Sequence, residues 1–227
     1  MEGRAAATRP LPRGPHNLTR DDVLSSQRER MLEAIAEVVA SKSYANVTVG
    51  DVVAGAGVSR KTFYEHFRDK EECFLAAFDS GAEKLLAAIV EAEPAGPGRI
   101  ERIRARMRAY LCTLAANPAF ARTFLIEVFA AGPRAMERRA EVHARFEQMI
   151  HGMYEETRRE LPDLPPVSEA IAAAAVGAFN ELVTKSVREG RTDRLPELED
   201  TLVHIQVSLF AGPVVAESLG LEGDAGG

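Results

Sequence analysis

At 227 residues, with 46% apolar and 27% charged residues, the chain is long enough for one large globular domain or for a small domain joined to a larger one. Aromatic residues make up only 6%, tryptophan is absent and alanine is abundant, a balance that favours packed helices over a β-sheet. No uncharged run is long enough for a membrane-spanning helix, and the N-terminus lacks the apolar block of a secretory signal. We therefore expect an all-α, soluble, cytoplasmic protein with no membrane partner.

The net charge of −6 argues at first against a nucleic-acid partner. The charge is uneven, however, because residues 1–70 carry 11 lysines and arginines against 9 acidic residues, so the acidic excess lies in the rest of the chain. Affinity for phosphates depends on the local field at the docking face, which allows DNA binding by the N-terminal part. The two cysteines, Cys73 and Cys112, lie in apolar helical patterns without paired spacing, and we expect two buried thiols in a reducing compartment.

Residues 1–24 contain four arginines and three prolines and show no periodic apolar face, so they are expected to form a disordered basic tail. Such a tail either has no role or acts as an arm that contacts the minor groove or the phosphates of DNA. After it, Ser26 and Glu29 have the spacing of a capping box and predict the start of a helix. The apolar stripe of that helix comprises Leu32, Ile35, Ala36 and Val39.

The next predicted helix is short and begins at Thr48. Thr48 and Asp51 again have capping-box spacing, and apolar residues then recur at helical intervals over about two turns. Gly55 and Gly57 follow, and because glycine accepts positive φ, the helix is expected to stop there. Ser59 lies where it can cap a second helix only a few residues later.

Within that second helix, Phe63 and Phe67 are one turn apart and are expected to pack on the core. Basic and aromatic residues fall on a different side of the helix, and that side is not required for packing in the core. Two helices joined by a tight turn, the second with a cationic outer face, are typical of a helix-turn-helix whose second helix enters the DNA major groove. An ordinary helical hairpin with a solvated charged face remains the alternative. The outer face comprises Arg60, Lys61, Tyr64 and Arg68.

This stretch closely resembles the DNA-binding signature of the TetR family of transcriptional regulators. The resemblance is dense over about residues 26–75 and only architectural beyond them. Lys61 departs from it, since many members carry glycine before the threonine, which makes the base preference hard to predict. The matching elements are Thr48, residues 56–59 (AGVS), residues 62–67 (TFYEHF) and residues 70–71 (KE).

The resemblance and the chemistry of DNA together predict which side chains contact it. The resemblance implies phosphate contacts by Thr48, Tyr64, His66 and Lys70. Side chains at the N-terminal end of the second helix reach deepest into the groove, where arginine and lysine favour guanine and a threonine methyl can meet thymine. That position predicts base contacts by Arg60, Lys61 and Thr62, with the capping Ser59 in the same DNA-binding set.

The remaining sequence predicts further helices separated by proline and glycine breaks. Asp69 and Glu72 are placed to cap a long helix that extends to about residue 93. About nine helices are expected in total. The predicted segments after residues 94–98 are a helix to about 116 with arginines on its outer face, one from 118 to about 131, one from 134 to 160, a loop at 161–166, and helices over 168–189 and 196–219.

These segments predict four parts: the basic tail, a three-helix DNA-binding domain over 25–70, a larger effector and dimerisation domain over 71–220, and a short disordered tail over 221–227. The last two helices are rich in alanine or apolar on more than one side, which leaves more apolar surface than one core needs. We expect them to pair with their copies across a two-fold axis, as the resemblance also implies.

The resemblance further implies a cavity for a small-molecule effector in the C-terminal part. Flexible methionines and aromatic rings can line such a cavity, although each one alone is more often plain core. A carboxylate or amide among them would need a partner that a ligand could supply. The effector would release DNA by favouring the conformation with misplaced reader helices. The candidate ligand-binding residues are Met107, Tyr110, Phe120, Phe124, Glu127, Phe146, Met149, Met153, Phe179 and Asn180.

Enzyme functions find less support, because neither a P-loop nor a Rossmann glycine pattern nor a di-iron motif occurs. His143, Glu147 and His151 recur at intervals of four, but they would span about 12 Å along one helix, too far to share an ion. We expect no cofactor and no metal. The expected partners are double-stranded DNA, a small-molecule effector and a second copy of the chain; a protein-binding helical adaptor and a small-molecule-binding helical enzyme remain the alternatives.

Overall fold

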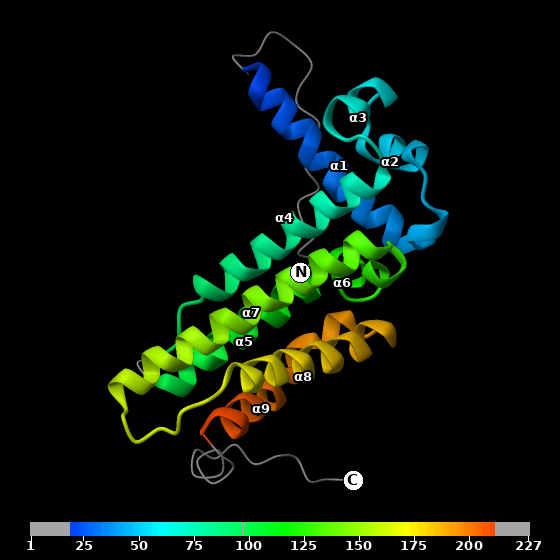
Figure 1. The fold of residues 1–227 in the computed structure, drawn as a ribbon. Helices are drawn as coiled ribbons and strands as arrows, with labels where there is room; N and C mark the ends of the chain where they lie inside the picture. Colours follow the sequence, from blue (N-terminus) through cyan, green and yellow to red (C-terminus); the bar gives the residue numbers. More distant parts are fainter. Residues whose placement is uncertain (1–18, 97, 212–227) are drawn as a thin grey trace. The chain divides into compact units, whose positions relative to one another are not determined.

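The computed structural model describes residues 19–96 and 98–211, and every regular element in these ranges is helical (Figure 1). The all-α prediction is therefore confirmed for the described chain. Its elements are α1 (Arg20–Lys42), η1 (Tyr44–Asn46), α2 (Val49–Ala56), α3 (Arg60–His66), α4 (Lys70–Val90), α5 (Arg99–Ala116), α6 (Pro118–Leu125), η2 (Glu127–Ala130), α7 (Pro133–Glu160), α8 (Glu169–Arg188), η3 (Thr192–Leu198) and α9 (Glu199–Ala211), where η denotes a 3-10 helix.

The chain divides into two compact units. The N-terminal unit comprises the chain up to Gly81 together with residues 119–136, and the C-terminal unit comprises residues 82–118 and the chain from Glu137 onward. The first unit thus holds α1 to α3, the first half of α4, α6 from its second residue, η2 and the first turn of α7. The sequence analysis placed a boundary at residue 70, whereas this division keeps the start of α4 with the DNA-binding helices and adds a segment from much later in the chain.

The first helix begins earlier than the sequence suggested. Thr19 is its N-cap: the Thr19 hydroxyl accepts the N–H of Asp22 at 3.1 Å, and the Asp22 carboxylate accepts the N–H of Thr19 at 2.8 Å. The prediction that Ser26 and Glu29 open the helix is wrong, because this earlier capping box comes first and no proline or glycine interrupts the chain after it. Residues 20–24, expected in the tail, are helical, and residues 1–18 lie outside the described residues.

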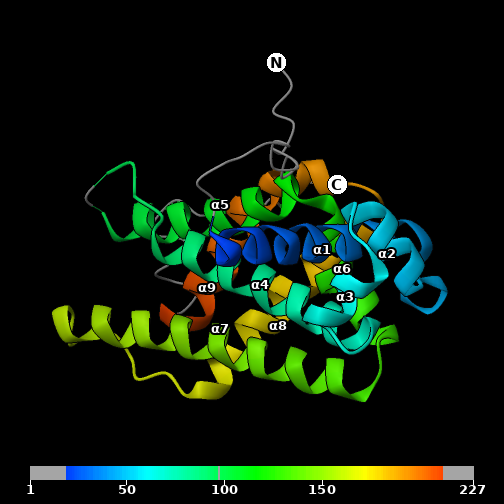
Figure 2. The same ribbon diagram turned by 90° about the horizontal axis from the view of Figure 1, so that it is seen from above.

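Packing of α1 against α2 forms much of the core of the N-terminal unit, and the two helices lie side by side in both ribbon views (Figures 1 and 2). The first half of α4 contributes buried aromatic rings to the same unit. Residues of this unit with no more than 2% of their surface exposed include Met31, Ile35, Val39, Val52, Phe63, Phe74 and Phe78.

The later segment, α6 and η2, is joined to the N-terminal unit by aromatic contacts. Phe124 on α6 stacks on Phe78 of α4 with ring centroids 4.8 Å apart, and Phe120 lies beside Gly81. A Cβ atom built on Gly81 would fall 1.9 Å from the Phe120 ring, so only glycine admits the ring at this distance. At Pro118 the helix starts with proline as expected, but it ends at Leu125, and Ile126 separates it from the 3-10 helix.

In the C-terminal unit, α5 contacts η3 and α9, and α8 packs beside α9 (Figure 1). Charged side chains fix the start of α9. The guanidinium of Arg108 donates to both carboxylate oxygens of Glu199, at 2.7 and 2.9 Å, and Arg104 pairs with Glu199 and Asp200. The sequence predicted one helix over 196–219; instead a 3-10 helix occupies 192–198, α9 begins at Glu199, and residues 212–219 lie outside the described residues.

The two cysteines have different surroundings. Cys73 on α4 is buried, and desolvation raises the pKa of its thiol to about 12. Cys112 on α5 is exposed, so the expectation of two buried thiols is wrong for Cys112. The apolar pattern around residue 112 is real, but position 112 falls on the edge of the helix that the core does not cover.

By length and composition α8 could cross a membrane, and it alone meets that test among the described helices. Its sequence has a second explanation, because 44% of its most apolar window is buried against the rest of the protein. A helix that packs into the core of a helical bundle passes the same test of length and composition.

Candidate nucleic-acid interface

The start of α2 is held by a capping box, as the sequence predicted. The Thr48 hydroxyl accepts the N–H of Asp51 at 3.2 Å, and the Asp51 carboxylate accepts the N–H of Thr48 at 2.9 Å. Lys42 on α1 adds an ion pair with Asp51 at 2.5 Å. The hydrogen bond from Lys42, followed by those from Thr48, lowers the pKa of Asp51 to about 2. The beginning of α2 is thereby joined to the end of α1.

The turn between α2 and α3 depends on Gly57. Its φ of 62° and ψ of 39° lie in the left-handed region, where a side chain is disfavoured, and the N–H of Val58 returns to the carbonyl of Val53 at 3.1 Å. Gly57 therefore ends α2. Gly55 lies inside the helix and has another role: a Cβ there would fall 3.2 Å from the Cβ of Ala34 on α1, so glycine permits close packing of α1 on α2.

Helix α3 has a buried side and an exposed basic side. Ser59 caps it as predicted, since its hydroxyl accepts the N–H of Thr62 at 3.0 Å. Phe63 is fully buried and Phe67 is 3% exposed, which confirms that both belong to the core. On the other side Tyr64 is 55% exposed, and its ring is oriented by an edge contact with Phe63 at 5.4 Å.

The two cations at the start of α3 are exposed. Arg60 is exposed, and the Lys61 side chain is 88% exposed and only 4.0 Å from Glu65, a weak surface pair. Thr62 is half-buried beneath them. Thus the three side chains expected to contact bases share the N-terminal end of one short helix. This is the geometry that places side chains against base edges when such a helix enters a major groove.

Two residues expected to contact phosphates, Lys70 and His66, are drawn into the protein surface instead of extending freely from it. The Lys70 ammonium donates to the carbonyls of Tyr44 at 3.0 Å and Val47 at 2.8 Å and lies 4.5 Å from the centre of the Tyr44 ring. It therefore holds the loop between α1 and α2. At His66 the Nε2 atom is buried without a hydrogen-bond partner among the described residues, and burial, followed by repulsion from Arg28, lowers its pKa. Thr48 and Tyr64 keep exposed side chains at the surface.

The ten candidate ligand-binding residues do not form one group. Phe120, Phe124 and Glu127 belong to the N-terminal unit, where the two rings pack with their centroids 5.2 Å apart. The others belong to the C-terminal unit: Met107, Tyr110, Phe146, Met149, Met153, Phe179 and Asn180. Burial raises the pKa of Tyr110, which indicates an apolar environment for its hydroxyl.

The buried carboxylate of Glu127 already has partners. It is 4% exposed and accepts the backbone N–H of Tyr44 at 3.0 Å and the hydroxyl of Ser43 at 3.2 Å. Arg122 on α6 pairs with it at 3.2 Å. The argument that Glu127 needs a ligand to satisfy it therefore does not hold, and in this structure the residue joins η2 to the end of α1.

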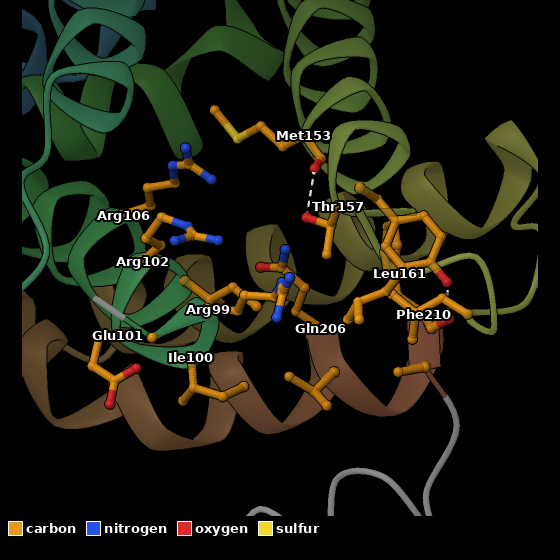
Figure 3. A pocket seen from close by; sticks show the side chains of 16 residues that line it. Arg99, Ile100, Glu101, Arg102, Arg106, Met153, Thr157, Leu161, Gln206 and Phe210 are labelled. Atoms are coloured by element: carbon orange, nitrogen blue, oxygen red, sulfur yellow. Dashed lines mark hydrogen bonds between the residues drawn. The ribbon is translucent and has the colours of Figure 1, made fainter. Parts of the chain in front are cut away.

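A cavity of about 570 Å³ lies within the C-terminal unit (Figure 3). Met153 is the one member of the predicted set that lines it. The sequence analysis missed its other walls, namely the start of α5, the end of α7 and the end of α9. The recurring arginines on the outer face of α5 are the sequence signal that marks one of these walls. The lining includes Arg99, Ile100, Arg102, Ile103, Arg106, Met153, Tyr154, Thr157, Leu164, Gln206, Val207 and Phe210.

Residues His143, Glu147 and His151 do not form a metal site, and no cluster of three or more metal-ligating side chains occurs in residues 19–96 and 98–211. His151 instead hydrogen-bonds through Nε2 with the carbonyl of Val167 at 3.1 Å.

Known proteins resemble this chain in sequence and in fold. Residues 31–77 match the family model described as bacterial regulatory proteins of the tetR family. The transcriptional regulator EthR of Mycobacterium tuberculosis is 28% identical over 227 residues, covering 93% of this chain and 99% of EthR. Among solved structures, the fatty acid degradation regulator FadR from Bacillus halodurans superposes with a TM-score of 0.70 at 17% identity, over 79% of this chain and 94% of FadR.

A second structure, FadR from Bacillus subtilis in complex with stearoyl-CoA, superposes with a TM-score of 0.66 at 19% identity, over 81% of this chain and 98% of that one. At these identities the superpositions establish the fold alone. A capped α2, a left-handed glycine turn and an exposed basic α3 define a helix-turn-helix DNA-binding protein. The chain belongs to the TetR family of bacterial transcriptional regulators. It is thus a DNA-binding regulator, in a family that is not enzymatic.

Proposed function

We propose that this regulator binds a palindromic operator as a homodimer, acts as a repressor in the cytoplasm, and is released from DNA by a small, largely apolar ligand. The observation that carries the DNA-binding part is the two-sided character of α3. Its apolar side is buried through Phe63, while Lys61 and Tyr64 on the other side are exposed. A solvent-facing tyrosine beside exposed cations is the arrangement that phosphate and base contacts require.

Roles within α3 can be separated by substitution. Tyr64→Ala removes a positioning contact and should weaken binding to all duplexes alike. Lys61→Ala should cost roughly 1–3 kcal/mol at the cognate site and relax the preference at one base position. Lys84→Ala is the matched control, because Lys84 is an exposed lysine on α4. Fluorescence anisotropy at fixed salt, with an operator selected from random duplexes, measures the effects; unchanged affinity in both α3 variants would contradict the proposal.

Dimerisation is supported by the surfaces of α8 and α9. Ala174 and Gly177 on α8 and Leu209 on α9 are exposed apolar or small residues in helices whose other sides are buried. Within the described part of the chain, no atom outside the local backbone of α8 lies within 4 Å of a Cβ built on Gly177, so a partner helix has room for close approach. Two copies related by a two-fold axis would present two α3 helices to successive major grooves.

The dimer is tested by placing a large charge on this surface. Gly177→Arg should convert the protein from dimer to monomer in sedimentation equilibrium at micromolar concentration. Gly152→Arg on α7, where a Cβ also meets open space, is the control and should leave the dimer intact. A wild-type monomer, or a Gly177→Arg variant that remains dimeric, would exclude this interface.

Ligand release is supported by the cavity in the C-terminal unit, whose volume is typical of sites for drug-sized molecules. A ligand that binds the DNA-incompetent conformation more tightly than the competent one would shift the population away from the operator. The magnitude of release is limited by that difference in affinity.

A further inference from the structure

The cavity in the C-terminal unit has one apolar wall and one cationic wall. The apolar side chains come from three helices and one loop: Ile100 and Ile103 on α5, Met153 on α7, Leu164 in the loop that follows α7, and Val207 and Phe210 on α9. With a volume of about 570 Å³, the cavity can bury most of a medium-sized apolar group. Such a wall binds hydrocarbon without directional contacts.

The cationic wall is a single face of α5. Arg99, Arg102 and Arg106 recur at i, i+3 and i+7, so their side chains project to the same side of the helix. In Figure 3, Arg102 and Arg106 extend from α5 toward Met153 and Thr157 on α7. Three guanidinium groups, together with the Glu101 carboxylate on the same helix, thus border a space whose opposite side is largely apolar.

The surroundings of Arg106 disfavour its positive charge. It is half-buried, and burial, followed by repulsion from Arg102, lowers its pKa, while attraction to Glu156 acts in the opposite direction. Among residues 19–96 and 98–211 no hydrogen bond or ion pair engages its guanidinium. By contrast, Arg99 pairs with Glu160 at 3.1 Å, and Arg104 and Arg108, on another side of the same helix, pair with Glu199. A half-buried cation next to a like charge is stabilised by any anion that enters the cavity.

We infer that the ligand of this cavity is an amphipathic organic anion, with a hydrocarbon portion against Ile103 and Phe210 and a carboxylate or phosphate head group on Arg106 and Arg102. This inference rests on the proposed ligand-responsive function and specifies the ligand class. An arginine fork binds either kind of head group through paired N–H donors, which a neutral ligand of the same size cannot use. Free fatty acids and acyl thioesters of a phosphorylated carrier share this chemistry.

The inference is tested by isothermal titration of the full chain with three probes: dodecanoate, dodecanoyl-CoA and the neutral dodecanol, each below its aggregation concentration. Both anions should bind at least about tenfold more tightly than dodecanol. The Arg106→Gln variant should lose about tenfold or more in affinity for the anions and little for dodecanol, because it removes the charge-assisted hydrogen bonds but keeps the apolar wall. Arg145→Gln, at an exposed arginine on α7, is the matched control and should bind like wild type.

Comparison of the two anions identifies the source of the head group. Tighter binding of dodecanoyl-CoA points to phosphates, and tighter binding of dodecanoate to a free carboxylate; either ranking supports the anionic site. Equal binding of dodecanol, or anion affinity unchanged in Arg106→Gln, would overturn it. Operator affinity measured in parallel distinguishes the anion-binding site from ligand-triggered release of DNA. If anions bind in a way that depends on Arg106 but DNA is not released, ligand-triggered release is refuted while the anion-binding site is supported.

Discussion

The buried carboxylate of Glu127 provides a sharp test of how the N-terminal unit is held together. In the Glu127→Ala variant, the backbone N–H of Tyr44 loses its acceptor while remaining in a buried setting, and Arg122 loses its ion-pair partner. The hydroxyl of Ser43 is the least affected, since it is partly exposed and water can replace the carboxylate.

The expected destabilisation follows from these contacts. A buried donor left unpaired costs about 1–3 kcal/mol. The Arg122 side chain is 40% exposed, so its loss of pairing is largely compensated by water and contributes about 0–1 kcal/mol. The sum is about 1–4 kcal/mol. Glu127→Gln keeps the shape of the side chain and one acceptor oxygen for the N–H of Tyr44. Its loss in free energy of unfolding should be only about half that of Glu127→Ala.

Urea unfolding followed by circular dichroism measures both variants, with unfolding of the wild type as reference. The order of stability should be wild type, then Glu127→Gln, then Glu127→Ala. An alanine variant as stable as the wild type, or more stable, would refute the reasoning. That result would restore the sequence-based expectation that Glu127 serves a ligand, because removing a polar group kept for binding commonly raises stability.

Two further predictions concern packing and pH. Gly81→Ala places a Cβ against the Phe120 ring and should lower the free energy of unfolding in urea by about 1–3 kcal/mol, less any gain in helix propensity. Gly152→Ala, where the Cβ meets open space, should be neutral or stabilising. Equal effects of the two substitutions would contradict the packing argument. Burial, followed by repulsion from Arg139, lowers the pKa of His143 to about 4, so the folded state disfavours the protonated imidazole. Stability should therefore fall as the pH drops from about 6.5 toward 4, and thermal unfolding of His143→Gln should show a weaker fall over that window; an unchanged slope would contradict it.

Local signals in the sequence were sufficient for the helix-turn-helix. The capping contacts of Thr48 and Ser59 involve only residues three positions further on, so they can be read without the fold. The one-turn spacing of Phe63 and Phe67 likewise marks the side of α3 that is buried. The same reasoning misplaced the start of α1, because Thr19 and Asp22 offer an equally good capping box seven residues earlier, in a segment that proline content had suggested was irregular.

Contacts between distant segments could not be read from the sequence. The apparent need of Glu127 for a ligand disappears once Tyr44, more than eighty residues earlier, supplies an N–H. Lys70 likewise belongs to the family motif, but its ammonium donates hydrogen bonds to the backbone carbonyls of Tyr44 and Val47. The cavity was misplaced because its cationic wall lies on the polar face of α5, which an argument from apolar periodicity assigns to solvent.

The central claim is that α3 enters the major groove, twice per dimer. Dimethyl sulfate protection of guanines on a selected operator tests it directly, since this reagent reports the major-groove N7 atom. The account predicts two symmetric protected patches about one or more helical turns apart, both lost in an Arg60→Ala, Lys61→Ala double variant that remains folded. Protection of a single patch, or two patches that persist in the double variant, would contradict it.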